Sequence, residues 1–107
     1  MDLIRQGDVL LIPVGKAPRG RKVKRDKGRV ILAYGEVTGH AHAILDGHVQ
    51  LITAEDANDL AMWFLLVPDK PASLVHEEHS TLVVPPGVYE VRRQREYAPE
   101  EIRLVAD

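Results

Sequence analysis

The stretch S-T-L-V-V-P-P-G-V-Y-E-V-R, residues 80–92, shows the pattern that indicates the fold of this chain. A short run rich in valine comes first, Pro85-Pro86-Gly87 follows, and residues 88–92 then alternate apolar and polar side chains. Alternation with a period of two is typical of a half-buried β-strand, and proline with glycine between two such runs marks a turn. The stretch therefore predicts two strands joined by a turn.

Similar short runs, separated by turn residues, occur throughout the rest of the sequence. Residues 36–45 should be extended with a break at Gly39, and Asp46-Gly47 is a hairpin signal that predicts 48–53 as the return strand. We expect an all-β domain, a small barrel or sandwich of about seven or eight short antiparallel strands. Residues 99–105 could add a short C-terminal helix, because proline and acidic residues suit a first helical turn. The other strands are expected at 8–14, 29–34, 61–67, 72–76 and 80–84.

Length and composition narrow the class of protein. A chain of 107 residues fits a single domain, and the absence of cysteine excludes disulfides and thiolate zinc ligands. No apolar run is long enough to span a bilayer, and the first residues lack the order of a signal peptide. These features favour a cytoplasmic protein without a membrane partner.

Basic residues are concentrated in one segment, residues 16–29 (KAPRGRKVKRDKGR), which holds eight of the fourteen lysines and arginines. Its glycines and proline predict a flexible, solvated loop. Such a loop could attract a small anionic molecule or a nucleic acid, or it could simply keep the protein soluble.

Four of the five histidines form two close pairs, His40 with His42 and His76 with His79. Neutral imidazoles bind first-row transition metals, so we predict these four residues as ligands of a divalent ion such as zinc, iron, manganese or nickel. The competing interpretation is that such pairs lie on solvated loops and only titrate near neutrality. The fifth histidine, His48, is expected to be an exposed hairpin residue.

Strand geometry decides which side chains could share a site with the histidines. On an extended segment Glu36 and Thr38 would lie on the same face as His40 and His42. Glu78 would lie beside His76 as a ligand or a general base, whereas His79 would join them only if the backbone bends. An open metal site of this kind could activate water for hydrolysis.

A metal-independent nuclease or cyclic-nucleotide phosphodiesterase is the second hypothesis. His42 and His79 would be its general base and acid, with Glu78 in the same catalytic group. The last strand leads into Q-R-E-Y, residues 94–97, and the three arginines of residues 91–97 could hold a phosphate. In this hypothesis Arg95 and Tyr97 take catalytic roles, and Arg93, Gln94 and Thr38 bind the substrate.

A non-enzymatic binding or assembly module is the third hypothesis. The apolar run 8–14 could be an exposed edge strand, and edge strands can pair between copies of a chain to give a homo-oligomer. A charged edge strand at 91–97 would be the corresponding interpretation of the arginines without a ligand.

Two resemblances add to this picture. Gly39-His40-Ala41-His42, together with His79 and residues 85–89, is similar to the two half-motifs of cupins, which implies a β-barrel holding a metal on histidines and a carboxylate. The chain departs from cupins because Asp46 stands where a glutamate is expected and because His79 precedes the Pro-Gly turn. The chain also resembles small uncharacterised bacterial and phage proteins, through residues 6–10, 35–42, 76–79 and 94–97.

Overall fold

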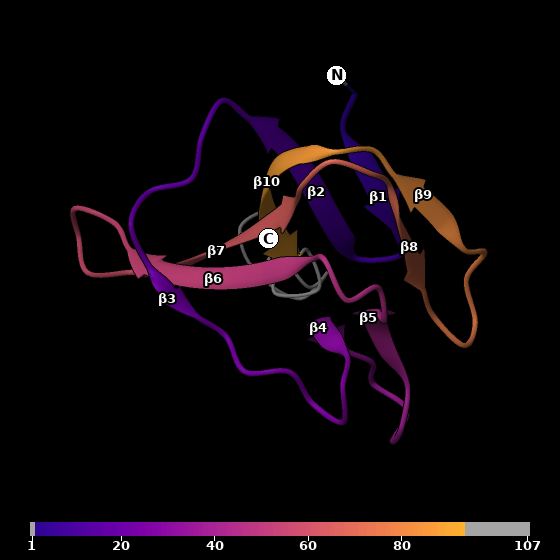
Figure 1. The fold of residues 1–107 in the computed structure, drawn as a ribbon. Helices are drawn as coiled ribbons and strands as arrows, with labels where there is room; N and C mark the ends of the chain where they lie inside the picture. Colours follow the sequence, from indigo (N-terminus) through magenta and orange to yellow (C-terminus); the bar gives the residue numbers. More distant parts are fainter. Residues whose placement is uncertain (1, 94–107) are drawn as a thin grey trace, which may run out of the picture.

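A computed structural model of the chain describes residues 2–93, which fold into ten strands in two antiparallel sheets (Figure 1). No helix occurs in this part of the chain, and hence none that could cross a membrane. The all-β prediction is confirmed. The sheets are arranged as in a sandwich and do not close into a barrel of the kind that the cupin resemblance implies. The predicted C-terminal helix at 99–105 lies outside the described residues.

The larger sheet has six strands in the order β1–β2–β10–β7–β6–β3, and the smaller one has four in the order β4–β5–β8–β9. The last strand in sequence, β10, lies between β2 and β7 in the larger sheet. The larger sheet comprises β1 (Ile4–Gln6), β2 (Val9–Val14), β10 (Gly87–Arg93), β7 (Ala61–Val67), β6 (Gln50–Glu55) and β3 (Arg21–Lys22). The smaller sheet comprises β4 (Val30–Tyr34), β5 (Ala41–Ile44), β8 (Ala72–Val75) and β9 (Leu82–Val84).

The core lies between the inner faces of the two sheets, and β10 shows why. Tyr89 and Val91 are buried in the core, and the intervening Glu90 is only partly covered, as the alternation in the sequence predicts. The Tyr89 hydroxyl donates to Pro85 O at 2.6 Å, so burial of this ring leaves its polar atom bonded. Fully buried side chains from both sheets, such as Leu65 and Ile44, each contribute about 1.5–3 kcal/mol of hydrophobic stabilisation.

The hairpin predicted at Asp46-Gly47 is wrong. Residues on either side of this turn belong to different sheets, since β5 pairs with β4 and β8 whereas β6 pairs with β3 and β7. Two hydrogen bonds from distant residues stabilise the turn. Ser73 N donates to Asp46 Oδ1, and Arg25 Nη2 donates to Asp46 O. These contacts lead the chain from one sheet to the other, and His48 stands in this crossing with its Nε2 2.8 Å from Lys70 O.

Residues 21–23, within the basic segment, pair with the larger sheet. Residues 21–22 form β3, which pairs with Ile52 and Thr53 at the edge of the larger sheet, and Val23 N donates to Leu51 O. A further bridge joins Asp26 to Arg29. Main-chain pairing with β6 therefore fixes this segment, although its side chains are mostly exposed.

The N-terminal strands differ from the prediction in a way that affects the site. The third hypothesis allowed residues 8–14 to form an exposed edge strand, but β2 lies between β1 and β10. The edge strand is β1, which is only three residues long and pairs with β2 through a two-residue turn, Gly7-Asp8. Gly7 has φ +58°, a conformation that glycine adopts without strain.

Candidate metal centre

Three segments that are distant in sequence meet at one open cavity of about 240 Å³. They are the β1–β2 turn, the loop that leads into β5, and the loop between β8 and β9. Residues 77–79 bend after β8, and this bend is the change of parity that His79 needed in order to join the other histidines. The cavity is lined by Asp8, Gly35, Glu36, Val37, His40, His42, His76, Glu78 and His79.

The four histidines form one contiguous group, called here the histidine cluster: His40, His42, His76 and His79. His76 lies at its centre, with its ring centroid 4.2 Å from that of His42, 4.7 Å from that of His79 and 5.9 Å from that of His40. The rings of His42 and His79 are 5.7 Å apart and nearly parallel. A neutral imidazole has one ring nitrogen with a lone pair, so the cluster brings several possible donor nitrogens close together.

His42 is the most buried member of the cluster, with 2% of its surface exposed. Gln6 determines which tautomer its neutral ring adopts. The Gln6 side-chain nitrogen donates to Leu74 O at 2.9 Å and to Ser80 O at 3.0 Å. These two bonds orient the amide so that its oxygen, Oε1, faces His42 Nδ1 at 2.8 Å. An amide oxygen only accepts, so Nδ1 carries the hydrogen and Nε2 of the neutral ring carries the lone pair.

That lone pair faces a carboxylate. Asp8 Oδ1 lies 3.3 Å from His42 Nε2, and Asp8 is partly exposed toward the cavity. Burial, followed by the neighbouring His76, lowers the pKa of His42 from its ordinary 6.5 to about 4, although Asp8 opposes the shift. A neutral imidazole nitrogen and a carboxylate oxygen thus converge on one point, where a cation would bind both.

Because Gly7 has no side chain, the His79 ring can lie close to the β1–β2 turn, near His42. A Cβ at this position would lie 2.7 Å from His79 Nε2 and 3.3 Å from His42 Cε1. The imidazole rings of His79 and His42 therefore pack against the backbone of the β1–β2 turn at Gly7. Three consecutive residues serve the site together: Gln6 orients His42, Gly7 admits the rings and Asp8 supplies the carboxylate.

Substitution of Gly7 by alanine should disturb the packing of the two imidazole rings against the β1–β2 turn. We expect a loss of about 1–3 kcal/mol in the free energy of unfolding, because the new methyl group meets His79 and because φ +58° is strained for alanine. Thermal or denaturant unfolding of the metal-free protein measures the loss. Gly28→Ala is the matched control, since Gly28 has φ +80° but no atom within 4 Å of an added Cβ. Equal losses in the two variants would contradict a contact with the histidines.

A second set of donors lies on the outer side of the cluster. One nitrogen each of His40 and His76 and one carboxylate oxygen of Glu77 all lie within 4.8 Å of one another. His40 Nδ1 is buried without a hydrogen-bond partner among residues 2–93, and its nearest acid is Glu78, at 3.6 Å. Two of these donor groups are already engaged, because Glu78 N donates to His76 Nδ1 and Ala41 N donates to Glu77 Oε1.

The surroundings of Glu77 favour the ionised form of its carboxyl group. The hydrogen bond from the Ala41 backbone and one from its own backbone lower the pKa of the Glu77 carboxyl, and His40 and His76 act in the same direction. The bond to Ala41 also ties the loop after β8 to the first residue of β5. Glu77 therefore holds the two histidine-bearing segments together.

Several residues predicted for the site are placed elsewhere. Thr38 and Glu36 do not extend β5, because residues 36–39 form a turn in which His40 N donates to Val37 O. Glu36 still lines the cavity, whereas Thr38 is exposed and is not among its lining residues. Arg93 lines a different cavity. Gln94, Arg95 and Tyr97 lie outside the described residues.

The roles of Gln6, Gly7 and Asp8 were not predicted. Their positions in the chain are some 70 residues from the β8–β9 loop that they contact, as in the bond from Gln6 to Leu74. The sequence does carry a signal, a glutamine, a glycine and an aspartate directly before an apolar strand. A polar turn of this kind is ordinary in a hairpin, so only the fold reveals its second role.

The match to a protein family spans this whole arrangement. Residues 5–94 match a family described as a domain of unknown function, DUF8820. The chain belongs to the DUF8820 family. All three segments of the site lie inside the part of the chain that DUF8820 covers, as do all ten strands but the first residue of β1. No curated protein and no solved structure matches the chain.

Proposed function

We propose that this protein binds a divalent transition-metal ion at the histidine cluster, with His42 as the anchoring ligand. The observation that carries the proposal is the bond between Gln6 and His42, which sets the tautomer with its lone pair on Nε2. Histidine ligands of metals usually donate their other ring N–H to a protein acceptor in this way. Asp8, beside that lone pair, and His79, over Gly7, are the other two inner ligands.

Ring spacing in the cluster supports the proposal. With zinc–nitrogen bonds of about 2.0–2.1 Å and tetrahedral angles, two imidazoles on one ion have centroids about 5 Å apart. The ring centroids of His42 and His79 are separated by 5.7 Å. Small side-chain rotations bring such rings to one ion. With only nitrogen and oxygen donors, the set suits zinc, iron, manganese or nickel.

The inner set is preferred over the outer one for a chemical reason. His76 Nδ1 accepts a hydrogen bond from Glu78 N, so the neutral ring carries its hydrogen on Nε2 and has no lone pair left for an ion. His40 and Glu77 would then not bind the ion. They would accept hydrogen bonds beside it, and Glu77 would hold the β8–β9 loop to β5. Metal binding through the outer set would require the Glu78–His76 bond to break.

The proposed centre is open to solvent on one side. His79 and Glu78 are exposed, and three protein ligands on a tetrahedral ion leave one position for water or a small ligand. A metal lowers the pKa of bound water, which makes metal-assisted hydrolysis the reaction class that fits best. Glu78, next to His40, is the candidate general base for that water.

The metal-independent nuclease gains less support from the same geometry. It needs an arginine beside the two histidines to stabilise a charged phosphorane, and Arg93 lines another cavity, stacked on Trp63. Arg95 and Tyr97 lie outside the described residues. The metal site requires none of these side chains.

Metal content tests the proposal directly. Protein produced without a histidine tag and purified in non-chelating buffer should contain one transition-metal ion per chain by elemental analysis. An ion present at about 1,000 times its Kd adds about 4 kcal/mol to stability, so EDTA should lower Tm by roughly 10 °C or more. Absence of stoichiometric metal, together with a Tm unchanged by EDTA and by added zinc, would refute the proposal.

A further inference from the structure

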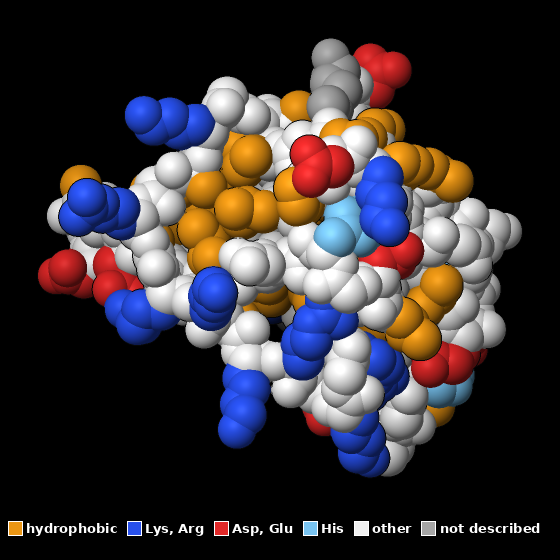
Figure 2. Space-filling view, in the orientation of Figure 1, with side chains coloured by type: hydrophobic (Ala, Val, Ile, Leu, Met, Phe, Trp, Pro, Cys, Tyr) orange, Lys and Arg blue, Asp and Glu red, His pale blue; other side chains and the backbone are white. Residues whose placement is uncertain are grey.

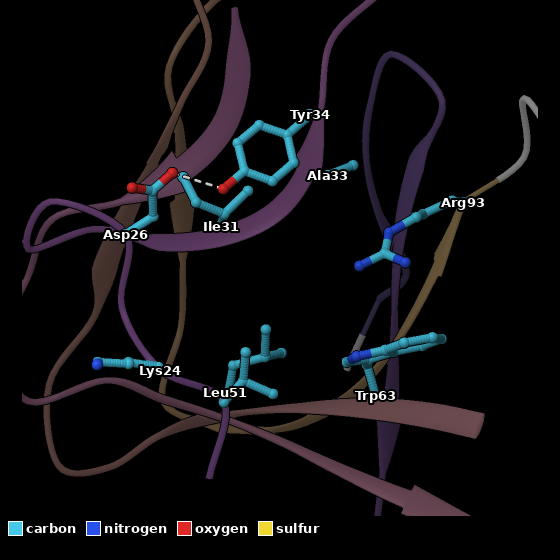
Figure 3. Close-up of a pocket in the computed structure, with 9 residues that line it drawn as sticks. Lys24, Asp26, Ile31, Ala33, Tyr34, Leu51, Trp63 and Arg93 are labelled. Carbon is cyan, nitrogen blue, oxygen red and sulfur yellow. Dashed lines mark hydrogen bonds between the residues drawn. The ribbon is translucent and has the colours of Figure 1, made fainter.

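A larger cavity, of about 380 Å³, lies apart from the histidine cluster (Figure 3). Ile31, Ala33 and Tyr34 of β4 form one wall, and Leu51 and Trp63 of the larger sheet form the opposite wall. Volumes of about 300–1,000 Å³ are typical of small-molecule sites in proteins. Val23, Lys24, Asp26 and Arg93 complete the lining, and no residue is shared with the histidine cavity.

The Arg93 guanidinium is held in the wall of this cavity by two contacts. Its Nε donates to Leu32 O at 2.7 Å, and its Cζ lies 4.6 Å from the ring centroid of Trp63. Figure 3 shows the guanidinium above the indole, reaching toward the open centre of the cavity. A planar, oriented guanidinium is the side chain best suited to hold a carboxylate or a phosphate.

The other charged residues make this cavity electropositive. Lys24 is exposed and lines the cavity, and Figure 3 shows it on the opposite side from Arg93. The one carboxylate in the lining, Asp26, accepts a hydrogen bond from the Tyr34 hydroxyl and lies 3.9 Å from Arg29. Among residues 2–93, the lining of the cavity therefore holds two cations, Arg93 and Lys24, and a single acid, Asp26, which Arg29 offsets.

The surroundings strengthen this field. Figure 2 shows lysine and arginine side chains gathered at the lower left of the molecule, where Figure 1 places β3 and the chain that leads to β4. These belong to the basic segment, residues 16–29, which also supplies Lys24. Clustered charge of one sign raises the local concentration of oppositely charged ligands.

We propose that this cavity binds a small planar organic anion, an aromatic or heteroaromatic ring that carries a phosphate or a carboxylate. The anionic group lies beside Arg93, and the ring packs against Leu51, Ile31 and Tyr34. An apolar wall alone would bind any hydrophobic molecule, and a cationic surface alone would bind any anion. The combination requires both parts in one ligand.

Trp63 provides a direct readout, because it is the only tryptophan in the chain and lies in the cavity wall. Fluorescence titration with adenosine monophosphate and with nicotinate tests a phosphate and a carboxylate on a ring. Adenosine and nicotinamide are their neutral counterparts, and inorganic phosphate is the anion without a ring. We expect saturable quenching by at least one of the two ring anions, with a Kd about tenfold or more below that of its neutral counterpart and of phosphate.

Variants locate the binding in the cavity. Arg93→Gln and Lys24→Gln should each raise the Kd of the bound ring anion, about tenfold for the arginine and severalfold for the lysine. Lys16→Gln removes one charge from the same segment outside the cavity and should leave the Kd unchanged. Lys24 is exposed, so its variant keeps the fold even if Arg93→Gln does not.

Three results would overturn the proposal. The first is no saturable change with either ring anion. The second is equal affinity for an anion and its neutral counterpart, which would indicate an apolar site only. The third is a Kd that rises in neither cavity variant, or that rises equally in Lys24→Gln and Lys16→Gln, which would indicate general attraction to the basic segment.

Discussion

Replacement of Gln6 by leucine should lower the free energy of unfolding by about 3 kcal/mol, because it leaves buried polar groups without partners. Gln6 is 3% exposed and bonds three groups at once: the carbonyls of Leu74 and Ser80 and the imidazole of His42. Leucine is similar in size but bonds none of them. Denaturant unfolding of the metal-free protein measures this loss of stability.

The same variant should weaken metal binding about 10- to 100-fold, which is the usual effect of removing the group that orients a histidine ligand. Gln50→Leu is the matched control, since Gln50 is an exposed residue of β6 and its replacement should leave both quantities nearly unchanged. Gln6→Glu separates the two roles, because a carboxylate still accepts from His42 Nδ1 but cannot donate to the carbonyls. Stability and metal affinity that match the wild type in Gln6→Leu would show that the amide does not orient His42.

Replacement of His42 by alanine should reduce metal affinity more than any other single change in the cluster. We expect a rise in Kd of at least about 100-fold, equivalent to roughly 2.7 kcal/mol, because the best-oriented ligand is lost. Competition of zinc against a chromophoric chelator measures this Kd. Asp8→Asn should give a smaller loss, since an amide oxygen keeps a weaker donor beside the same position.

Two further variants decide between the inner and the outer donors. Glu77→Gln should change the Kd for zinc by less than about tenfold if the ion lies between His42, Asp8 and His79. His48→Ala removes a histidine outside the cluster and controls for general loss of imidazole. A large loss in Glu77→Gln with an unchanged Kd in His42→Ala would place the ion in the outer set instead.

Local patterns in the sequence predicted the strands well and their partners poorly. The alternation in β10 and the Pro-Pro-Gly turn before it are read from neighbouring residues, and the structure confirms them. Which sheet a strand joins depends on residues far away, so the Asp46-Gly47 turn was assigned to a hairpin although it connects two sheets. Strands as short as β1 and β3 carry too few residues for a period of two to be visible.

For the candidate site, the sequence indicated which histidines to consider but not what surrounds them. The spacing of His40 and His42 placed both on one face, and the structure brings them together with His76 and His79. Arg93 was assigned to the same site because a guanidinium suits a phosphate, yet the strand carries it to another cavity. The residue that sets the chemistry of His42, Gln6, is joined to it only by long-range pairing of strands.

The position of β10 constrains when the histidine cluster can be completed during synthesis. The β1–β2 hairpin, which carries Gln6 and Asp8, connects to the rest of its sheet only through β10, the last described strand to leave the ribosome. The strands of the smaller sheet, which flank both histidine pairs, are made earlier and pair with one another. The hairpin that carries Gln6 and Asp8 can therefore join the larger sheet only after residues 87–93 have been synthesised.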